Sequence, residues 1–173
     1  MSKENLVQEC RREFDNCHYT AVSHIIWLRD KRRVKFFFIV LPLIFGGLAT
    51  FELLAKSESF WFRAAATLCA FLAGLMPSVY AALKYDEDLE RLKVSAAEFF
   101  NLRDRFRQCA ILSTNKSFKD FEVEFRVLMD RMERARQDSH TAPEKYFQMA
   151  KEKIEKGDYS FDVDEQDEPK PTP

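Results

Sequence analysis

The sequence predicts an all-α membrane protein, in which a two-helix transmembrane hairpin follows an N-terminal amphipathic helix and precedes a C-terminal cytoplasmic helical region. Two observations carry this prediction. Apolar residues crowd into two runs between positions 34 and 83, and each run is close to the roughly 20 helical residues that cross about 30 Å of hydrocarbon. Outside those runs charged residues are dense, so the average composition hides an apolar insert within a polar chain.

Residues 1–33 are expected to form a cytoplasmic amphipathic helix. Apolar or small residues recur there at alternating steps of three and four, which is the spacing of a helix with a narrow apolar seam. This first seam comprises Val7, Cys10, Phe14, Cys17, Ala21, His24 and Leu28. An imidazole in such a seam can titrate or hydrogen-bond across it, so His24 is a candidate functional residue.

The first transmembrane helix is expected at 34–55. No charge interrupts the run from Phe36 to Phe51. Each Phe, Leu, Ile or Val near the bilayer centre favours insertion by about 0.3 to 0.6 kcal/mol, whereas a central charge costs about 2.5 to 3.5 kcal/mol and a terminal one much less. The first run is therefore expected to insert unaided.

A short extracytoplasmic turn at 56–59 leads to the second transmembrane helix, 60–83. This run is richer in alanine and carries Arg63 at its start, so it is expected to insert packed against the first. If the bend is centred on the turn, Glu52 and Arg63 stand at similar depth on the two arms. Three interpretations stay open: an interhelical ion pair, outward snorkelling, or a ring of charge at the mouth of an oligomeric pore.

Small residues recur every four positions along the second run and form a ridge, which allows helix backbones to approach closely. We call this set the small-residue ridge: Ala66, Ala70, Gly74, Ser78 and Ala82. Gly46 or Gly47 of the first run can receive it within the hairpin, or another copy can receive it between chains. Neither run carries a broad polar stripe, so any pore requires several copies.

Basic residues indicate the orientation. Those before the first run are Arg29, Lys31, Arg32, Arg33 and Lys35. Three more follow the second run, while only Lys56 and Arg63 lie between the runs. By the positive-inside rule both termini are cytoplasmic. The alternative, a buried hairpin in a soluble bundle, is disfavoured because two near-continuous apolar runs exceed what a small core covers.

Residues 84–157 are expected to form further cytoplasmic helices. A second seam is formed by Tyr85, Leu89, Leu92, Ala96, Phe99, Arg103, Phe106 and Ala110. We expect this helix to pack beside the one at 1–33, and seams of this length can also support self-association as a coiled coil.

The later helices are marked by their ends. "SFKD", from Ser117, has the form of a capping box, and "TAPE", from Thr141, begins a helix that Gly157 should stop. Acidic residues and proline dominate 158–173, which predicts a disordered tail. Tyr159 and Phe161 are apolar points in it that can dock on a partner, although a solubilising tail is the simpler interpretation.

The sequence offers little for catalysis or for metal binding. Cys10, Cys17 and His24 are seven residues apart, so successive side chains on a helix are about 10 Å apart, whereas a metal needs ligands about 2 Å from one centre. There is no phosphate-binding glycine loop and no arguable Ser/His/Asp set. We expect no metal, no cofactor and no enzymatic activity, and the charge pattern indicates membrane lipids, with no nucleic acid as a partner.

The order of segments resembles the SLATT family of two-transmembrane effector domains in bacterial nucleotide-signalling conflict systems. The resemblance covers about residues 10–155 and is carried by "YTAVSHIIWLRDKRR", the hairpin, "AAEFFNLRDRFRQCA", "FEVEFRVLMDRMERA" and "APEKYFQMA". It offers no catalytic residues; Tyr19, His24 and Arg29 occupy positions similar to recurring ones before the first span.

The resemblance implies an antiphage role in the bacterial inner membrane. A sensor, a nucleotide-synthase partner or a second messenger would trigger a homo-oligomer to permeabilise that membrane. The alternative function is a membrane anchor or scaffold that recruits a soluble partner through its cytoplasmic helices.

Overall fold

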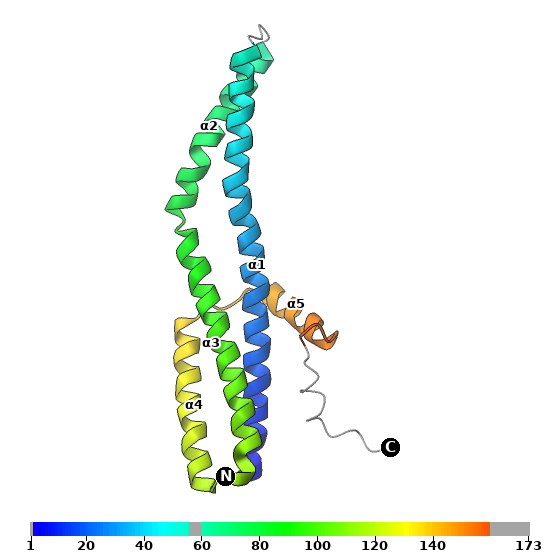
Figure 1. Cartoon of the computed structure of the whole chain (residues 1–173), viewed down its shortest axis with the longest axis vertical. Coiled ribbons are helices and arrows are strands. Elements are labelled where there is room, and N and C mark those ends of the chain that lie inside the picture. Colours follow the sequence, from blue (N-terminus) through cyan, green and yellow to red (C-terminus); the bar gives the residue numbers. More distant parts are fainter. Residues whose placement is uncertain (1, 56–59, 160–173) are drawn as a thin grey trace. The chain divides into compact units, whose positions relative to one another are not determined.

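A computed structural model describes residues 2–55 and 60–159 of the chain, with side chains for 2–51 and 60–159. The predicted turn at 56–59, the Glu52 side chain and residues 160–173 of the predicted tail lie outside the described residues. Within this part every regular element is a helix, which confirms the all-α class (Figure 1). The order is α1 (Lys3–Ala55), α2 (Phe60–Ala82), α3 (Tyr85–Leu112), the 3-10 helix η1 (Ser113–Asn115), α4 (Phe118–Asp138) and α5 (Glu144–Glu155).

The helices divide between two compact units. The packed unit contains residues 2–27 and 92–159 of the described chain, and the span unit contains residues 28–55 and 60–91. Helices α1 and α3 each contribute to both units.

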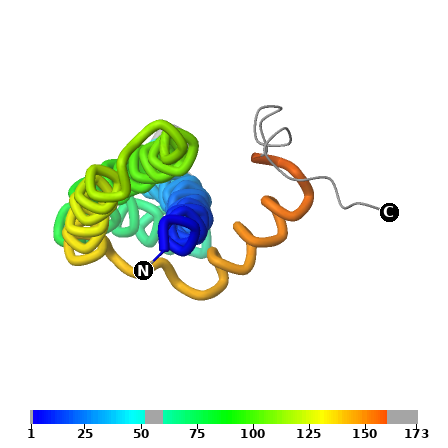
Figure 2. Tube along the Cα trace, turned by 90° about the horizontal axis from the view of Figure 1, so that it is seen from below, coloured from blue at the N-terminus to red at the C-terminus, as the bar shows by residue number. Residues whose placement is uncertain are grey.

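In the packed unit, α1, α3 and α4 lie side by side around one apolar cluster (Figures 1 and 2). The cluster comprises Leu6, Cys10, Cys17, Ala21, Phe99, Leu102, Phe106, Cys109, Phe121, Leu128 and Met132. It joins first-seam residues of α1 to second-seam residues of α3, so the predicted packing of these two helices is confirmed. Phe14 packs against the cluster while remaining half-buried.

Helix α5 covers a second stripe of α1. Val22 and Ile26 of α1 form a smaller cluster with Tyr146 and Ala150 of α5, and Tyr159 packs against it. The sequence predicted one narrow apolar seam on α1. The buried surface of α1 is wider than that seam, because other helices cover α1 on two sides and bury two stripes of it. The start of the predicted tail is also corrected, since Tyr159 packs within its own chain.

The register of the second seam differs from the prediction along α3. Leu92, Phe99 and Phe106 are buried as expected. Beyond Phe99, however, Leu102 and Cys109 are almost fully buried, whereas Arg103 and Ala110 are only half-buried. An α-helix has 3.6 residues per turn, so its buried face drifts away from a strict alternation of three and four.

Two helix ends follow the predicted signals. The Ser117 hydroxyl accepts a hydrogen bond from the Asp120 backbone N–H at 3.2 Å and caps α4. Gly157 follows α5 with a φ of 82°, a left-handed conformation that costs glycine little. The cap at Ser117 and the stop at Gly157 are confirmed, whereas α5 begins after Pro143 with no side-chain cap.

The span unit contains two helices long and apolar enough to cross a membrane, in α1 and α2. No residue of the most apolar window of either helix is buried. Large apolar side chains such as Leu43 and Trp61 are 72% and 80% exposed. Exposing a contiguous apolar surface of this kind to water is costly in free energy. The predicted pair of apolar spans is thus present, and it lies at the surface of its own chain.

Candidate functional site

The exposed faces of the two spans are the first candidate site. On α2 the half-buried residues recur at helical spacing: Ala66, Cys69, Leu72, Ala73, Met76 and Tyr80. At the end of this stripe the ring of Tyr80 lies 5.9 Å from that of Phe38 on α1. The half-buried stripe is therefore the face of α2 that packs against its own chain, and most of the small-residue ridge lies off it.

The ridge itself is largely uncovered. Ala66 is half-buried, but Ala70, Gly74, Ser78 and Ala82 are exposed. A Cβ atom built on Gly74 would meet no heavy atom within 4 Å, and the same holds at Gly46 and Gly47. The chain thus leaves room at all three glycines for groups from outside it.

The charges near the bend are described only in part. Arg63 is exposed near the start of α2, and its carbonyl accepts a hydrogen bond from the Thr67 hydroxyl at 2.9 Å. The side chain of Glu52 lies outside the described residues. The ion pair, the snorkelling and the pore-mouth ring therefore all stay predictions.

A charged contact in the span unit joins α1 to the start of α3. The Lys35 ammonium lies 2.6 Å from an Asp86 carboxylate oxygen, and the Tyr80 hydroxyl donates to the same oxygen at 2.6 Å. One turn earlier on α1, Lys31 pairs with Asp88 at 3.3 Å. The basic residues before the first span predicted only the orientation of the chain. The signal for this contact is the i, i+4 spacing of Lys31 and Lys35, together with Asp86 and Asp88 just after the second span.

The break between α2 and α3 is sharp. Lys84 adopts a φ of 49°, which is unusual for a residue with a side chain and costs of order 1 kcal/mol or more. The backbone N–H of Glu87 then bonds the Lys84 carbonyl at 3.1 Å and begins α3. This turn brings Asp86 next to Tyr80, so local geometry creates the contact with Lys35.

His24 is the central polar residue of the packed unit, as the first seam suggested. Its side chain is 1% exposed, with Nε2 3.1 Å from the His140 carbonyl and Nδ1 3.2 Å from the Ser95 hydroxyl. A carbonyl only accepts, so Nε2 carries the proton and Nδ1 accepts from Ser95. Burial lowers the pKa of His24. The neutral imidazole thereby ties α1 to α3 and to the segment between α4 and α5.

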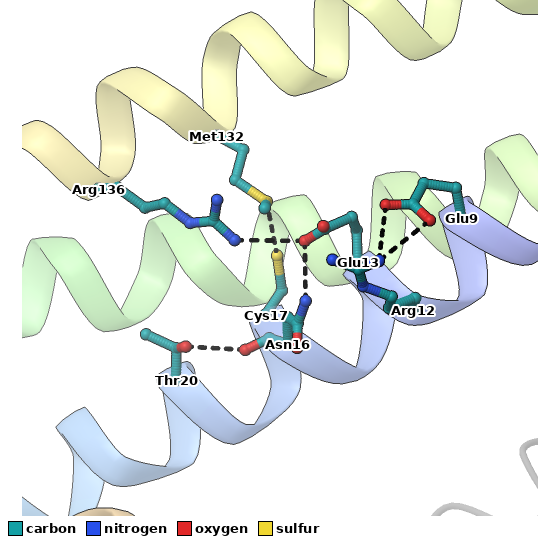
Figure 3. Close-up of polar contacts among 8 residues, drawn as sticks. All are labelled: Glu9, Arg12, Glu13, Asn16, Cys17, Thr20, Met132 and Arg136. Atoms are coloured by element: carbon teal, nitrogen blue, oxygen red, sulfur yellow. Dashed lines mark hydrogen bonds and ion pairs between the residues drawn. The ribbon is translucent and has the colours of Figure 1, made fainter. Parts of the chain in front are cut away.

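A buried carboxylate, that of Glu13, lies about three turns before His24 on α1 (Figure 3). The Glu13 side chain is 4% exposed and accepts from Arg136 of α4 at 3.3 Å and from Asn16 at 3.1 Å. Beside it, the Cys17 thiol donates to the Met132 sulfur at 3.6 Å. Burial raises the pKa of Cys17 to about 12, so this thiol stays protonated and serves packing.

Arg103, the charged member of the second seam, lies at the edge of the core. Its guanidinium stacks 5.1 Å from the Phe100 ring centre and pairs with Asp104 at 2.7 Å. It also lies 3.3 Å from Nδ1 of His18. Arg103 therefore keeps its charge partnered while its stem contributes packing.

The interior polar groups are consistent with packing roles. Among the described residues, no buried side-chain nitrogen or oxygen lacks a hydrogen-bond partner. In the same part of the chain, no group of three or more His, Cys, Asp or Glu is placed to hold a metal ion.

No family model, no curated protein and no solved structure matches the chain. The described residues form an all-α fold with two helices long and apolar enough to cross a membrane.

Proposed function

We propose that this chain is a non-enzymatic, homo-oligomeric membrane effector whose hairpins assemble in the bacterial inner membrane and permeabilise it, with both termini in the cytoplasm. One observation supports assembly most directly. Most of the small-residue ridge is exposed, and the space beside Gly74 is empty within the chain. A helix from a second copy can approach such a ridge closely.

In this proposal the packed unit keeps the hairpins in a closed assembly until a trigger binds. Its contacts at His24 and Glu13 join helices from distant parts of the chain. A trigger that binds this unit would act on the spans through α1 and α3, which continue into the span unit. The resemblance to SLATT domains supports a role in antiphage defence, with a sensor, a nucleotide synthase or a second messenger as the trigger.

The substitution Gly74→Leu tests assembly through the ridge. A Cβ atom at position 74 meets no heavy atom of its own chain within 4 Å, whereas a leucine there would separate two helices packed along the ridge. Losing about 1.4 kcal/mol per helix contact weakens association about tenfold. We expect a smaller complex in mild detergent, together with less membrane depolarisation and less dye entry after induced expression.

The matched control is Ala65→Leu, which adds bulk at an exposed position of α2 outside the ridge. It should leave the size of the complex and the depolarisation unchanged. A wild-type chain that is monomeric in mild detergent and leaves the membrane potential unchanged at high expression would overturn the proposal.

The second candidate function is a membrane anchor or scaffold that recruits a soluble partner through the packed unit. Exposed Val123 and Val127, on successive turns of α4, favour it, since they are 61% and 58% exposed. Removing residues 158–173, which contain the acidic tail, distinguishes a pore former from an anchor that binds its partner through the tail. An anchor that binds through the tail loses its partner, whereas a pore former still assembles.

A further inference from the structure

The basic residues before the first span divide between two faces of α1. Lys31 and Lys35, one turn apart, form the face towards α3. Both lysines are half-buried, and they pair with Asp88 at 3.3 Å and with Asp86 at 2.6 Å. The positive charges on this face are therefore neutralised within the span unit, and an anion from outside would have to displace an aspartate to reach them.

The other face of α1 carries three exposed arginines, Arg29, Arg32 and Arg33, which we call the arginine face. Arg33 lies 3.7 Å from Asp30 on the same helix, and 72% of its side chain remains exposed. Neither Arg29 nor Arg32 forms an ion pair or a side-chain hydrogen bond with any described residue. The arginine face thus presents positive charge that its own span unit leaves largely uncompensated.

The arginine face continues into exposed apolar surface. Residues three and four apart share a helix face, so Phe36 follows Arg32 and Arg33 by one turn, and Leu43 lies two turns further on. The side chains of Phe36 and Leu43 are 61% and 72% exposed. At 1.5 Å per residue, Arg32 and Arg33 precede Phe36 by about 4.5 to 6 Å along the axis. The polar layer on one side of a bilayer is about 5 to 8 Å deep, so this spacing matches a headgroup followed by acyl chains.

We propose that the arginine face binds the phosphate of an anionic phospholipid, whose acyl chains pack on Phe36 and Leu43. Charge complementarity selects this occupant. A guanidinium group is a planar fork of N–H donors that matches phosphate oxygens, and basic residues beside a span attract anionic lipids. A soluble phosphate ester would reach the arginines but would leave the adjoining apolar surface without a partner.

The competing explanation is the positive-inside rule alone, which requires net positive charge beside the span and no bound lipid. That rule treats lysines and arginines alike, whereas the structure pairs the lysines with aspartates and leaves the arginine face open. The inference rests on the proposed function only in that the spans lie in a membrane. It requires neither assembly of the hairpins nor permeabilisation.

Native mass spectrometry of the full-length chain in mild detergent tests the inference. The chain is titrated with phosphatidylglycerol or with phosphatidylcholine of the same acyl chains. We expect wild type to bind phosphatidylglycerol more tightly than phosphatidylcholine. Arg29→Gln/Arg32→Gln should bind phosphatidylglycerol about 25-fold more weakly, because each basic residue near an anionic lipid contributes about fivefold. Arg29→Lys/Arg32→Lys, which keeps both charges, should recover most of the binding and thereby shows that the loss does not come from misfolding.

The matched control is Arg11→Gln/Arg12→Gln, which removes two exposed arginines of α1 from the packed unit. This variant should bind phosphatidylglycerol as tightly as wild type. Equal binding of the two lipids by wild type, or an equal loss of phosphatidylglycerol in the two glutamine variants, would overturn the inference. Gly74→Leu should retain the lipid, so a failure of lipid binding is distinguished from a failure of assembly.

Discussion

Replacing Phe106 by alanine is expected to unfold the packed unit or to lower its stability severely. Phe106 is 0% exposed in the main cluster, and its ring meets that of Phe125 edge-on, 6.3 Å away. Truncating a buried phenylalanine costs about 3 to 5 kcal/mol, because transfer energy is lost and a cavity remains. For a unit of this size each kcal/mol lowers the melting temperature by about 4 to 8 °C.

The fluorescence of Trp27 provides the measurement. Trp27 stacks on Tyr146 at 6.0 Å within the packed unit, and Trp61→Phe removes the other tryptophan of the chain. The matched control is Val123→Ala on α4, where the side chain is 61% exposed and truncation should cost within about 0.5 kcal/mol. Equal melting temperatures for the Phe106 and Val123 variants would contradict the position of Phe106 in the core.

Replacing His24 is expected to have the next largest effect. His24→Ala leaves the His140 carbonyl and the Ser95 hydroxyl without their partner inside the unit. Each of these partly buried hydrogen bonds contributes about 0.5 to 1.5 kcal/mol, and the cavity left by the buried imidazole adds to this loss. His24→Gln, which keeps a donor and an acceptor, should recover part of the stability.

The same residue predicts a dependence of stability on pH. Burial places the folded pKa of His24 below its ordinary value of 6.5, so the unfolded chain binds the proton more readily. The stabilisation from neutral His24 is complete above about pH 6.5 and declines as the pH falls from there towards the folded pKa. The melting temperature of the wild type should therefore fall more between pH 8 and pH 5.5 than that of His24→Gln.

His24→Gln serves as the reference because other groups titrate over the same range. Charge repulsion from His140, whose own carbonyl His24 bonds, lowers the pKa of His24 further. The Gln variant keeps every other group, so the difference between the two proteins reports His24 and its interaction with His140. Parallel pH profiles would show that the imidazole is not neutral and buried in solution.

The sequence predicted the features that depend on local pattern. The two spans follow from uninterrupted apolar runs, and the cap at Ser117 follows from a motif of four residues. The packing of α1 against α3 follows from the spacing of the two seams. Residues three and four apart share a helix face, so each seam forms an apolar face that another helix can cover.

The remaining features depend on contacts between segments far apart in the sequence. Burial of Val22 and Ile26 requires α5 to fold back onto α1, and nothing near those residues indicates it. Pairing of Glu13 with Arg136 joins helices more than a hundred residues apart. A strict alternation of three and four predicts Arg103 as the seam residue between Phe99 and Phe106, whereas the structure buries Leu102 at that turn.

The central claim is that the two apolar helices cross a bilayer as a hairpin, with the segment between them outside the cytoplasm. A Ser57→Cys variant in a Cys69→Ser background tests this claim with a membrane-impermeant maleimide on intact spheroplasts. The other three cysteines are buried, and a Ser2→Cys chain is the matched control for the cytoplasmic side. We expect labelling at position 57 before lysis and labelling at position 2 only after it. Labelling at position 57 only after lysis, or a chain that stays soluble without detergent, would contradict it.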